Sequence, residues 1–338
     1  MSRPVQVEVV LSNSESLPVV DVWLVIDILR ASTVIVSWFA AGGGELYPVD
    51  SVASARLLAE RLKQEGKNPI LMGEQNAIAP QGFDLGNSPL EITEELVKKN
   101  PCAVMATTNG TVAMLKAAST GAPVLVACAR NAHSALSVAL SRGRRIGILC
   151  SGRKGRPAWD DALCAGLLIA CLAEHFPDIR LADSARLALL AWKGLEDFKS
   201  SLRSADHAIF LDKIGYGDDI TFAGEINVSR VVPELYEHPD GDGMRAVLKP
   251  ATLNEQMLLP DNRLLPASRG IEHRGGLRYP IVSSATPAAS LPAQQDEGMY
   301  RHLPDSGTGN VFFAGVKYKK SNKNKMIKHS RHKEGYSS

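Results

Sequence analysis

The sequence lacks any apolar run that approaches the roughly 18 uninterrupted residues that a membrane-spanning helix needs. Its first residues, Met1 to Val5, lead straight into an alternating strand pattern and carry no apolar signal-peptide core. The five cysteines are odd in number and show no C-x-x-C spacing, which is typical of reduced core residues. We therefore expect a cytoplasmic protein without a membrane partner.

The common catalytic signatures are missing as well. The sequence has no G-x-x-x-x-G-K-[ST], no G-x-S-x-G, no H-E-x-x-H and no zinc spacing, and Gly42-Gly43-Gly44 does not match a dinucleotide fingerprint. Cys150 follows an apolar strand pattern, so a nucleophilic role stays open for it, although no histidine is near it in sequence. His133, His175 and His207 are isolated on helix patterns, where surface or core positions outweigh catalysis.

What the sequence does contain is a regular alternation of short apolar strands and amphipathic helices, in a chain of 338 residues with 45% apolar content. Val22-Trp23-Leu24-Val25-Ile26 is continuous enough for a strand that is buried on both faces. The alternation predicts an α/β fold, a three-layer αβα arrangement with a mostly parallel sheet. The expected strands are residues 5–11, 19–28, 45–48, 69–72, 102–105, 124–128 and 146–150, and the expected helices are residues 31–41, 51–65, 88–98, 111–119, 131–142 and 160–176.

The pattern weakens toward the C-terminus. Residues 183–211 are helical in short pieces, 215–219 form a turn, and 228–235 are either one more strand or a connection. Beyond Pro250, residues that do not build a core dominate, and a lysine-rich run follows. We therefore divide the chain into an α/β domain of residues 1–249 and a low-complexity, largely disordered basic tail of residues 250–338.

The stretch Gly82–Glu91 combines a flexible polar loop with a complete helix start. Ser88 at the N-cap, Pro89 at the first helical position and Glu91 reaching back to the Ser88 N–H form a capping box for a helix that ends near Lys98. The glycines before it allow the backbone to turn its N–H groups toward one point, where the helix dipole favours an anion. The loop is therefore either a phosphate cradle or a well-capped helix after a tight turn.

Acidic residues lie at three other predicted junctions between a strand and the segment that follows it. Asp27 ends one strand, Glu74 follows another, and Asp160-Asp161 begin the helix after a third. Asp27, Glu74 and the pair Asp160-Asp161 offer the hard oxygen ligands that suit Mg²⁺, although Asp27 and Asp160 also fit helix caps. Arg30 lies near the same edge, where it clamps a phosphate or forms a salt bridge. The turn Thr108-Asn109-Gly110-Thr111 adds hydroxyl and amide donors before a helix.

Taken in order, four segments resemble motifs of the 2-phosphosulfolactate phosphatase family. The resemblance covers about residues 5–235, and the second segment is its most specific part. It implies a Mg²⁺-dependent acid phosphatase that releases phosphate from 2-phosphosulfolactate on the way to coenzyme M. The four segments are Asp27-Ile28-Leu29-Arg30-Ala31-Ser32-Thr33, Gly82-Phe83-Asp84-Leu85-Gly86-Asn87-Ser88-Pro89, Thr107-Thr108-Asn109-Gly110-Thr111, and Asp161 followed by Ala165-Gly166.

Added to the residues above, the resemblance implies an active site, in which Asp84 rests on the resemblance alone. The predicted catalytic residues are Asp27, Arg30, Asp84 and Asp161, the predicted substrate-binding residues are Asn87, Ser88, Thr108, Asn109 and Gly110, and the predicted Mg²⁺ ligands are Asp27, Glu74 and Asp161. Two positions depart from the family pattern, because Gln75 stands where an arginine is expected and Asp160 where a glutamate is expected. Arg130 is an unexpected cation that offers compensation for Gln75.

The expected partner is a small anionic organophosphate, and a homodimer is left open. A haloacid-dehalogenase mechanism is disfavoured because Leu29 stands where its second aspartate belongs. Two alternatives remain: a drifted family member that acts on another small organophosphate, and a non-catalytic binding protein whose basic tail contacts nucleic acid.

Overall fold

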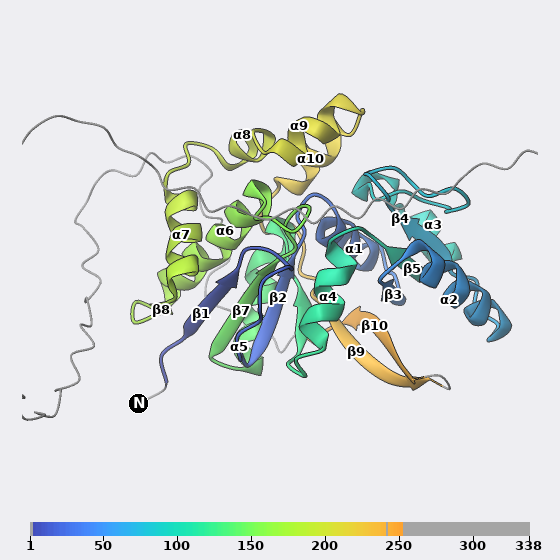
Figure 1. The fold of residues 1–338 in the computed structure, drawn as a ribbon, viewed down its shortest axis with the longest axis horizontal. Coiled ribbons are helices and arrows are strands. Elements are labelled where there is room, and N and C mark those ends of the chain that lie inside the picture. Colours follow the sequence, from blue (N-terminus) through green and yellow to red (C-terminus); the bar gives the residue numbers. More distant parts are fainter. Residues whose placement is uncertain (1–2, 241–242, 253–338) are drawn as a thin grey trace, which may run out of the picture. The chain divides into compact units, whose positions relative to one another are not determined.

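A sheet of ten strands forms the centre of the part of the chain that the structure describes, residues 3–240 and 243–252 of a computed structural model. These residues all lie in the first of two units, Met1–Gly275. The strand order is β4-β5-β3-β10-β9-β6-β2-β7-β1-β8 (Figure 1). The strands are β1 Gln6–Val10, β2 Val22–Ile26, β3 Glu45–Val49, β4 Ile70–Gly73, β5 Cys102–Ala106, β6 Val124–Val126, β7 Arg145–Cys150, β8 Arg180–Leu181, β9 Pro233–Asp240 and β10 Gly243–Pro250.

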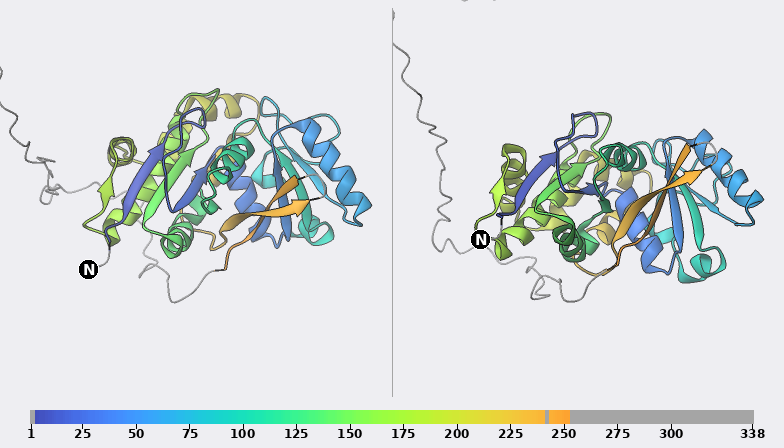
Figure 2. Two further views of the ribbon diagram at one scale, coloured as in Figure 1. Left: turned by 60° about the horizontal axis from the view of Figure 1, so that its bottom comes forward. Right: turned by 90° about the horizontal axis from the view of Figure 1, so that it is seen from below.

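The sheet consists of two parallel sets joined by an antiparallel hairpin. Strands β4, β5 and β3 pair in parallel at one end, and β6, β2, β7, β1 and β8 pair in parallel at the other. The hairpin β9–β10 lies between them and pairs antiparallel with both sets (Figure 2). The predicted α/β fold with a mostly parallel sheet is confirmed. The hairpin was not predicted; residues 228–235 were left open as one more strand or a connection, and β9 begins within them.

Helices cover both faces of the sheet. Helices α5, α6 and α7 share one apolar core with β1, β2 and β7, and α1, α3 and α4 share a second core on the opposite face of β2 that continues under β3–β5. Helix α2 packs on the remaining face of β3 and β5. The helices are α1 Ala31–Ala40, α2 Val52–Gln64, α3 Glu94–Lys99, α4 Gly110–Ala118, α5 Ala132–Arg142, α6 Trp159–His175, α7 Asp183–Lys193, α8 Phe198–Arg203, α9 Asp206–Lys213 and α10 Gly217–Ala223, with two short 3₁₀ turns at Pro89–Glu91 and Ala129–Asn131.

Strand β2 shows why the sequence pattern was informative. All five side chains of Val22–Ile26 are fully buried, because they alternate between the two large cores on opposite faces of the sheet. A strand that is covered on both faces needs apolar residues at every position. The continuous run therefore identified a central strand, as predicted.

The predicted helix of residues 88–98 is interrupted, and this part of the prediction is wrong. Glu91 does not bond to the Ser88 N–H; its Oε2 accepts from the N–H of Gly86 at 2.6 Å. Ile92 is extended, with φ −86° and ψ 110°, so the first turn ends there. Thr93 then caps α3 by accepting from the N–H of Leu96. A carboxylate that can reach two nearby N–H groups does not reveal in the sequence which one it takes.

The predicted tail, residues 250–338, lies outside the described residues except for 250–252. Within the described part, every helix is too short or too polar to cross a membrane.

Candidate functional site

The candidate site lies where two connections join the two parallel sets of strands. The chain passes from β2 to β3 through α1, and from β5 to β6 through α4. Asp27 follows β2, and Gly110 is the first residue of α4. A Cβ atom on Gly110 would lie 2.6 Å from Oδ2 of Asp27, so only glycine allows the two passages to approach this closely. Ligands of open α/β sheets bind outside such carboxyl ends of strands.

Asp27 is 7% exposed, and its Oδ1 accepts a hydrogen bond from the N–H of Ala31 at 3.3 Å. Burial raises the pKa of the Asp27 carboxyl to about 6, and the negative charges of Asp160 and Glu74 act in the same direction, whereas His207 opposes them. Asp27 is thus a buried carboxyl among other carboxylates. The N-cap residue of α1 is Arg30 rather than Asp27, but Asp27 accepts from the first N–H of the helix, and this contact uses only one of its two oxygens.

Asp161 ties α6 to the ends of β2 and β7. Its Oδ1 accepts from the N–H of Ile28 at 3.0 Å, and its Oδ2 accepts from the N–H of Gly152 at 3.0 Å and from the hydroxyl of Ser151 at 3.1 Å. Burial, Asp160 and Asp27 raise the pKa of Asp161 well above its usual range. The carboxylate therefore fixes the backbone directly after Asp27, and both of its oxygens already have donors.

Glu74 joins the end of β4 to the loop before α4. Its two oxygens accept from the N–H of Ala77 at 2.8 Å and from the N–H of Thr108 at 2.7 Å. The structure therefore brings Glu74 together with the predicted substrate-binding turn of Thr108, Asn109 and Gly110.

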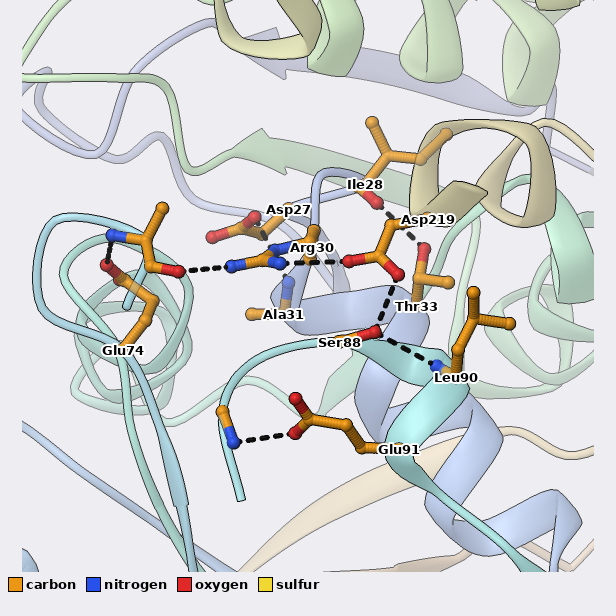
Figure 3. Close-up of polar contacts among 12 residues, drawn as sticks. Asp27, Ile28, Arg30, Ala31, Thr33, Glu74, Ser88, Leu90, Glu91 and Asp219 are labelled. Carbon is orange, nitrogen blue, oxygen red and sulfur yellow. Dashed lines mark hydrogen bonds and ion pairs between the residues drawn. The ribbon is translucent and has the colours of Figure 1, made fainter. Parts of the chain in front are cut away.

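Arg30 is the centre of a buried network (Figure 3). Its Nη1 donates to Oδ2 of Asp219 at 2.9 Å, and its Nη2 donates to the carbonyl oxygen of Ala77 at 2.8 Å. Its guanidinium lies 4.2 Å from the ring centroid of Tyr216. The hydroxyl of Ser88 donates to Oδ1 of Asp219 at 2.6 Å. Of the two roles left open for Arg30, the structure shows the salt bridge, and that salt bridge holds the Ser88 loop.

Asn87 differs from its neighbours because it is buried without a complete set of partners. It is 4% exposed, and its Oδ1 has no hydrogen-bond partner among the described residues. An unpaired buried amide oxygen is costly, so it is an acceptor that a ligand group would satisfy.

Two residues that the sequence singled out make their contacts outside this cluster. Asp84 is exposed, and its Oδ2 accepts from the N–H of Leu71 at 2.8 Å, a contact that ties it to β4 rather than to Asp27 or Asp161. Arg130 pairs with Glu225 and lies 3.6 Å from the ring centroid of Phe222, so its contacts hold the end of α10.

All five cysteines are buried and reduced. Burial and the charges of Asp161 and Asp160 raise the pKa of the Cys150 thiol well above its usual range. A thiol held in its protonated form is a poor nucleophile, which disfavours the role left open for Cys150.

Three residues of the site carry no site signal in the sequence: His207 on α9, and Tyr216 and Asp219 at α10. Asp219 was placed in a turn, and His207 was treated as an isolated histidine. Their signal was weak because their partners are distant in the chain; Arg30 and Asp219, for example, are 189 positions apart.

The carboxylates offer oxygen ligands for a metal ion. Within the described ranges, no group of three or more His, Cys, Asp or Glu side chains is arranged to hold a metal ion. Mg²⁺ needs less, since it takes one or two carboxylates and leaves its other positions to water and phosphate oxygens. Asp27 and Glu74 fit that smaller set, because a divalent cation would offset the repulsion between crowded carboxylates. Asp161 fits it less well because its Oδ2 already accepts two hydrogen bonds, whereas each oxygen of Glu74 accepts one and keeps a lone pair for a cation.

Serine 88 offers a test of the network. Ser88→Ala removes the donor to Asp219 and the acceptor for the Leu90 N–H, so we expect a loss of about 1 kcal/mol in the free energy of unfolding. We also expect a fall in kcat/KM per folded molecule. Ser51→Ala is the matched control, because it removes the exposed N-cap of α2 and should cost similar stability without a loss of activity. Equal activities of the two variants would confine Ser88 to a structural role.

Buried carboxylates beside helix-starting loops, at the carboxyl ends of strands in a mostly parallel sheet, define the ligand site of an α/β enzyme. The model of the 2-phosphosulpholactate phosphatase family matches residues 10–238. The chain therefore belongs to the 2-phosphosulpholactate phosphatase family, a family of phosphoric monoester hydrolases, and the resemblance noted in the sequence is confirmed.

Curated relatives agree with the family match. The chain is 36% identical over 221 residues to a probable 2-phosphosulfolactate phosphatase of Deinococcus radiodurans. The aligned residues make up 65% of this chain and 90% of the relative. It is 34% identical over 218 residues to a protein of the same name from Pseudothermotoga lettingae, with 64% and 90% covered. A third such protein, from Thermus thermophilus, is 35% identical over 222 residues, with 65% and 90% covered.

Proposed function

We propose that this chain hydrolyses 2-phosphosulfolactate to sulfolactate and phosphate with Mg²⁺ as its cofactor, as a step of the coenzyme M biosynthesis type. The observation that carries the proposal is that Asp27, Glu74 and Asp161 lie close together at the carboxyl ends of β2 and β5, where the chain continues into α1 and α4. Family membership supports the same activity.

In this proposal Asp27 and Glu74 would hold a Mg²⁺ ion, which would supply charge neutralisation for the phosphate. The chain's own residues bind and orient the ester. The backbone N–H groups at the start of α4 hold phosphate oxygens, the unpaired Oδ1 of Asn87 accepts a hydrogen bond from a water bound with the ester, and Asp161 fixes the position of the loop after Asp27. Asp27 either positions the attacking water or attacks phosphorus itself, and a trapped acyl-phosphate on Asp27 would identify the second route.

The substrate also carries a carboxylate and a sulfonate, which need cations. The loop after β7 supplies Arg153, Lys154 and Arg156, of which Lys154 and Arg156 are exposed. The guanidinium of Arg153 lies 5.2 Å from the ring centroid of Phe210 on α9, so the loop is held against that helix. We assign the sulfonate to this loop.

The assay compares two esters that differ only in the sulfonate, 2-phosphosulfolactate and 2-phospholactate, with the full chain in Mg²⁺ and in excess chelator. We expect Mg²⁺-dependent phosphate release, with kcat/KM at least about tenfold higher for the sulfonated ester. Mg²⁺ should also raise the melting temperature of the protein without substrate. Full activity in chelator would remove the metal from the proposal, and equal rates on the two esters would favour the drifted family member.

The alternative with a nucleic-acid-binding tail concerns residues outside the described part of the chain, so it stays a prediction.

A further inference from the structure

His207 on α9 lies at the same cluster of carboxylates, and it has not been given a role above. Its Nδ1 is 3.7 Å from Oδ2 of Asp160, a distance typical of an ion pair rather than a hydrogen bond. The side chain of Asp160 is 3% exposed and that of His207 is 20% exposed. The histidine therefore has one ring nitrogen turned to a buried carboxylate, and its side chain is partly exposed.

The backbone places this pair beside Asp27. Asp160 precedes Asp161 in the first turn of α6, and Asp161 accepts from the N–H of Ile28, the residue that follows Asp27. His207 also lies near enough to Asp27 for its charge to favour the Asp27 carboxylate. The described cluster thus contains carboxylates that hold or activate oxygen and, beside them, an imidazole, the side chain that most often transfers protons in enzymes.

The chemistry of the proposed reaction requires such a donor. The leaving group of 2-phosphosulfolactate is a secondary alkoxide, which is a strong base and leaves poorly unless it is protonated as the P–O bond breaks. An aryl phosphate such as p-nitrophenyl phosphate has a weakly basic leaving group and needs no proton.

We propose that His207 is a catalytic residue, the general acid that protonates the leaving oxygen of an alkyl phosphate, and that Asp160 is the positioning residue that orients its ring. This inference rests on the proposed phosphatase function. Nδ1 faces Asp160, so Nε2 carries the transferred proton. The bond between phosphorus and the ester oxygen breaks, its electron pair stays on that oxygen, and the oxygen takes the Nε2 proton to form the alcohol. Water supplies hydroxide to phosphorus, directly or after a first attack by Asp27, and its remaining proton returns to the imidazole.

The test compares His207→Asn and His207→Gln with the wild-type full chain on 2-phosphosulfolactate and on a series of aryl phosphates whose leaving groups differ in basicity. We expect kcat/KM to fall by about 10²- to 10⁴-fold on the alkyl ester and by less than about tenfold on p-nitrophenyl phosphate. Across the aryl series, the rate should depend on leaving-group basicity more steeply in the variants. Because this slope is a ratio of rates, it does not depend on the fraction of protein that is folded.

His175→Asn is the matched control. His175 ends α6, the helix whose first turn contains Asp160, and lies about 22 Å along the axis from Asp160 at 1.5 Å per residue. The control should retain wild-type rates on both kinds of ester. Equal losses on alkyl and aryl esters in the His207 variants, or an unchanged slope, would overturn the assignment of His207 and leave the phosphatase function standing. A wild-type protein that releases phosphate from neither ester would overturn both.

Discussion

Asp27→Asn is expected to remove phosphatase activity and, at the same time, to make the metal-free protein more stable at neutral pH. We expect kcat to fall by about 10³-fold or more, because the substitution removes a charge at the centre of the site with little change in volume. The stability effect has the opposite sign. A carboxyl whose pKa is raised by folding stabilises the native state below its unfolded pKa, and this contribution is lost as the pH rises through the folded pKa, here about 6.

The wild-type chain without metal therefore carries a cost above pH 6 that asparagine does not have. A rise of the Asp27 pKa from its ordinary value of 3.8 to about 6 corresponds to about 3 kcal/mol. Urea denaturation in chelator at pH 4 and at pH 7.5 measures the difference between variant and wild type, which should grow with pH. Adding Mg²⁺ should raise the melting temperature of the wild type and leave that of the variant unchanged.

Asp21→Asn is the control with the opposite sign. Hydrogen bonds from Arg145 and Arg144 hold the pKa of Asp21 below its usual range, so its loss should destabilise the protein at pH 7.5 without affecting turnover. An Asp27→Asn protein that keeps near-parental activity, or that gains as much from Mg²⁺ as the wild type, would reduce Asp27 to a helix cap.

Asp219→Ala is expected to be the most destabilising single change at the site. Asp219 and Arg30 are each 2% exposed, so the substitution leaves a guanidinium in the interior without its carboxylate. Breaking a buried pair in this way costs about 3–5 kcal/mol. Activity per folded molecule should also fall, because the Ser88 loop loses its anchor.

The comparison for Asp219→Ala is Arg186→Ala, which breaks a pair whose side chains are 66% and 96% exposed. That change should alter the free energy of unfolding by less than about 1 kcal/mol in the same urea experiment. The double variant Arg30→Met with Asp219→Leu should recover much of the stability lost in Asp219→Ala and remain inactive. If Asp219→Ala lowered the free energy of unfolding by less than Arg186→Ala does, the buried pair would contribute little to stability.

The parts of the fold that the sequence predicted depend on local patterns. The buried run Val22–Ile26 and the polar residues that follow strands, such as Asp27 and Glu74, could be found because strand ends and helix starts have signatures within a few residues. The same patterns predicted the parallel sheet and the edge at which the site lies.

The parts that were missed depend on contacts between distant residues. Asp219 meets Ser88 across 131 residues, and no local rule indicates that a short helix near residue 219 closes over a loop near residue 88. His207 looked isolated because its partner, Asp160, is far away in the chain. Glu91 fitted a capping box and bonded to another N–H within reach, which shows that a local pattern can name the right residue and the wrong contact.

The hairpin β9–β10 has a consequence for how the chain is made. Strands β1 to β8 leave the ribosome first, and until residues 233–250 follow, β3 and β6 each present an unpaired edge. Such edges are templates for pairing with other chains. The last strands to be synthesised in the described part of the chain therefore close both edges together, and a nascent chain that stalls before Pro233 would expose two aggregation-prone borders at once.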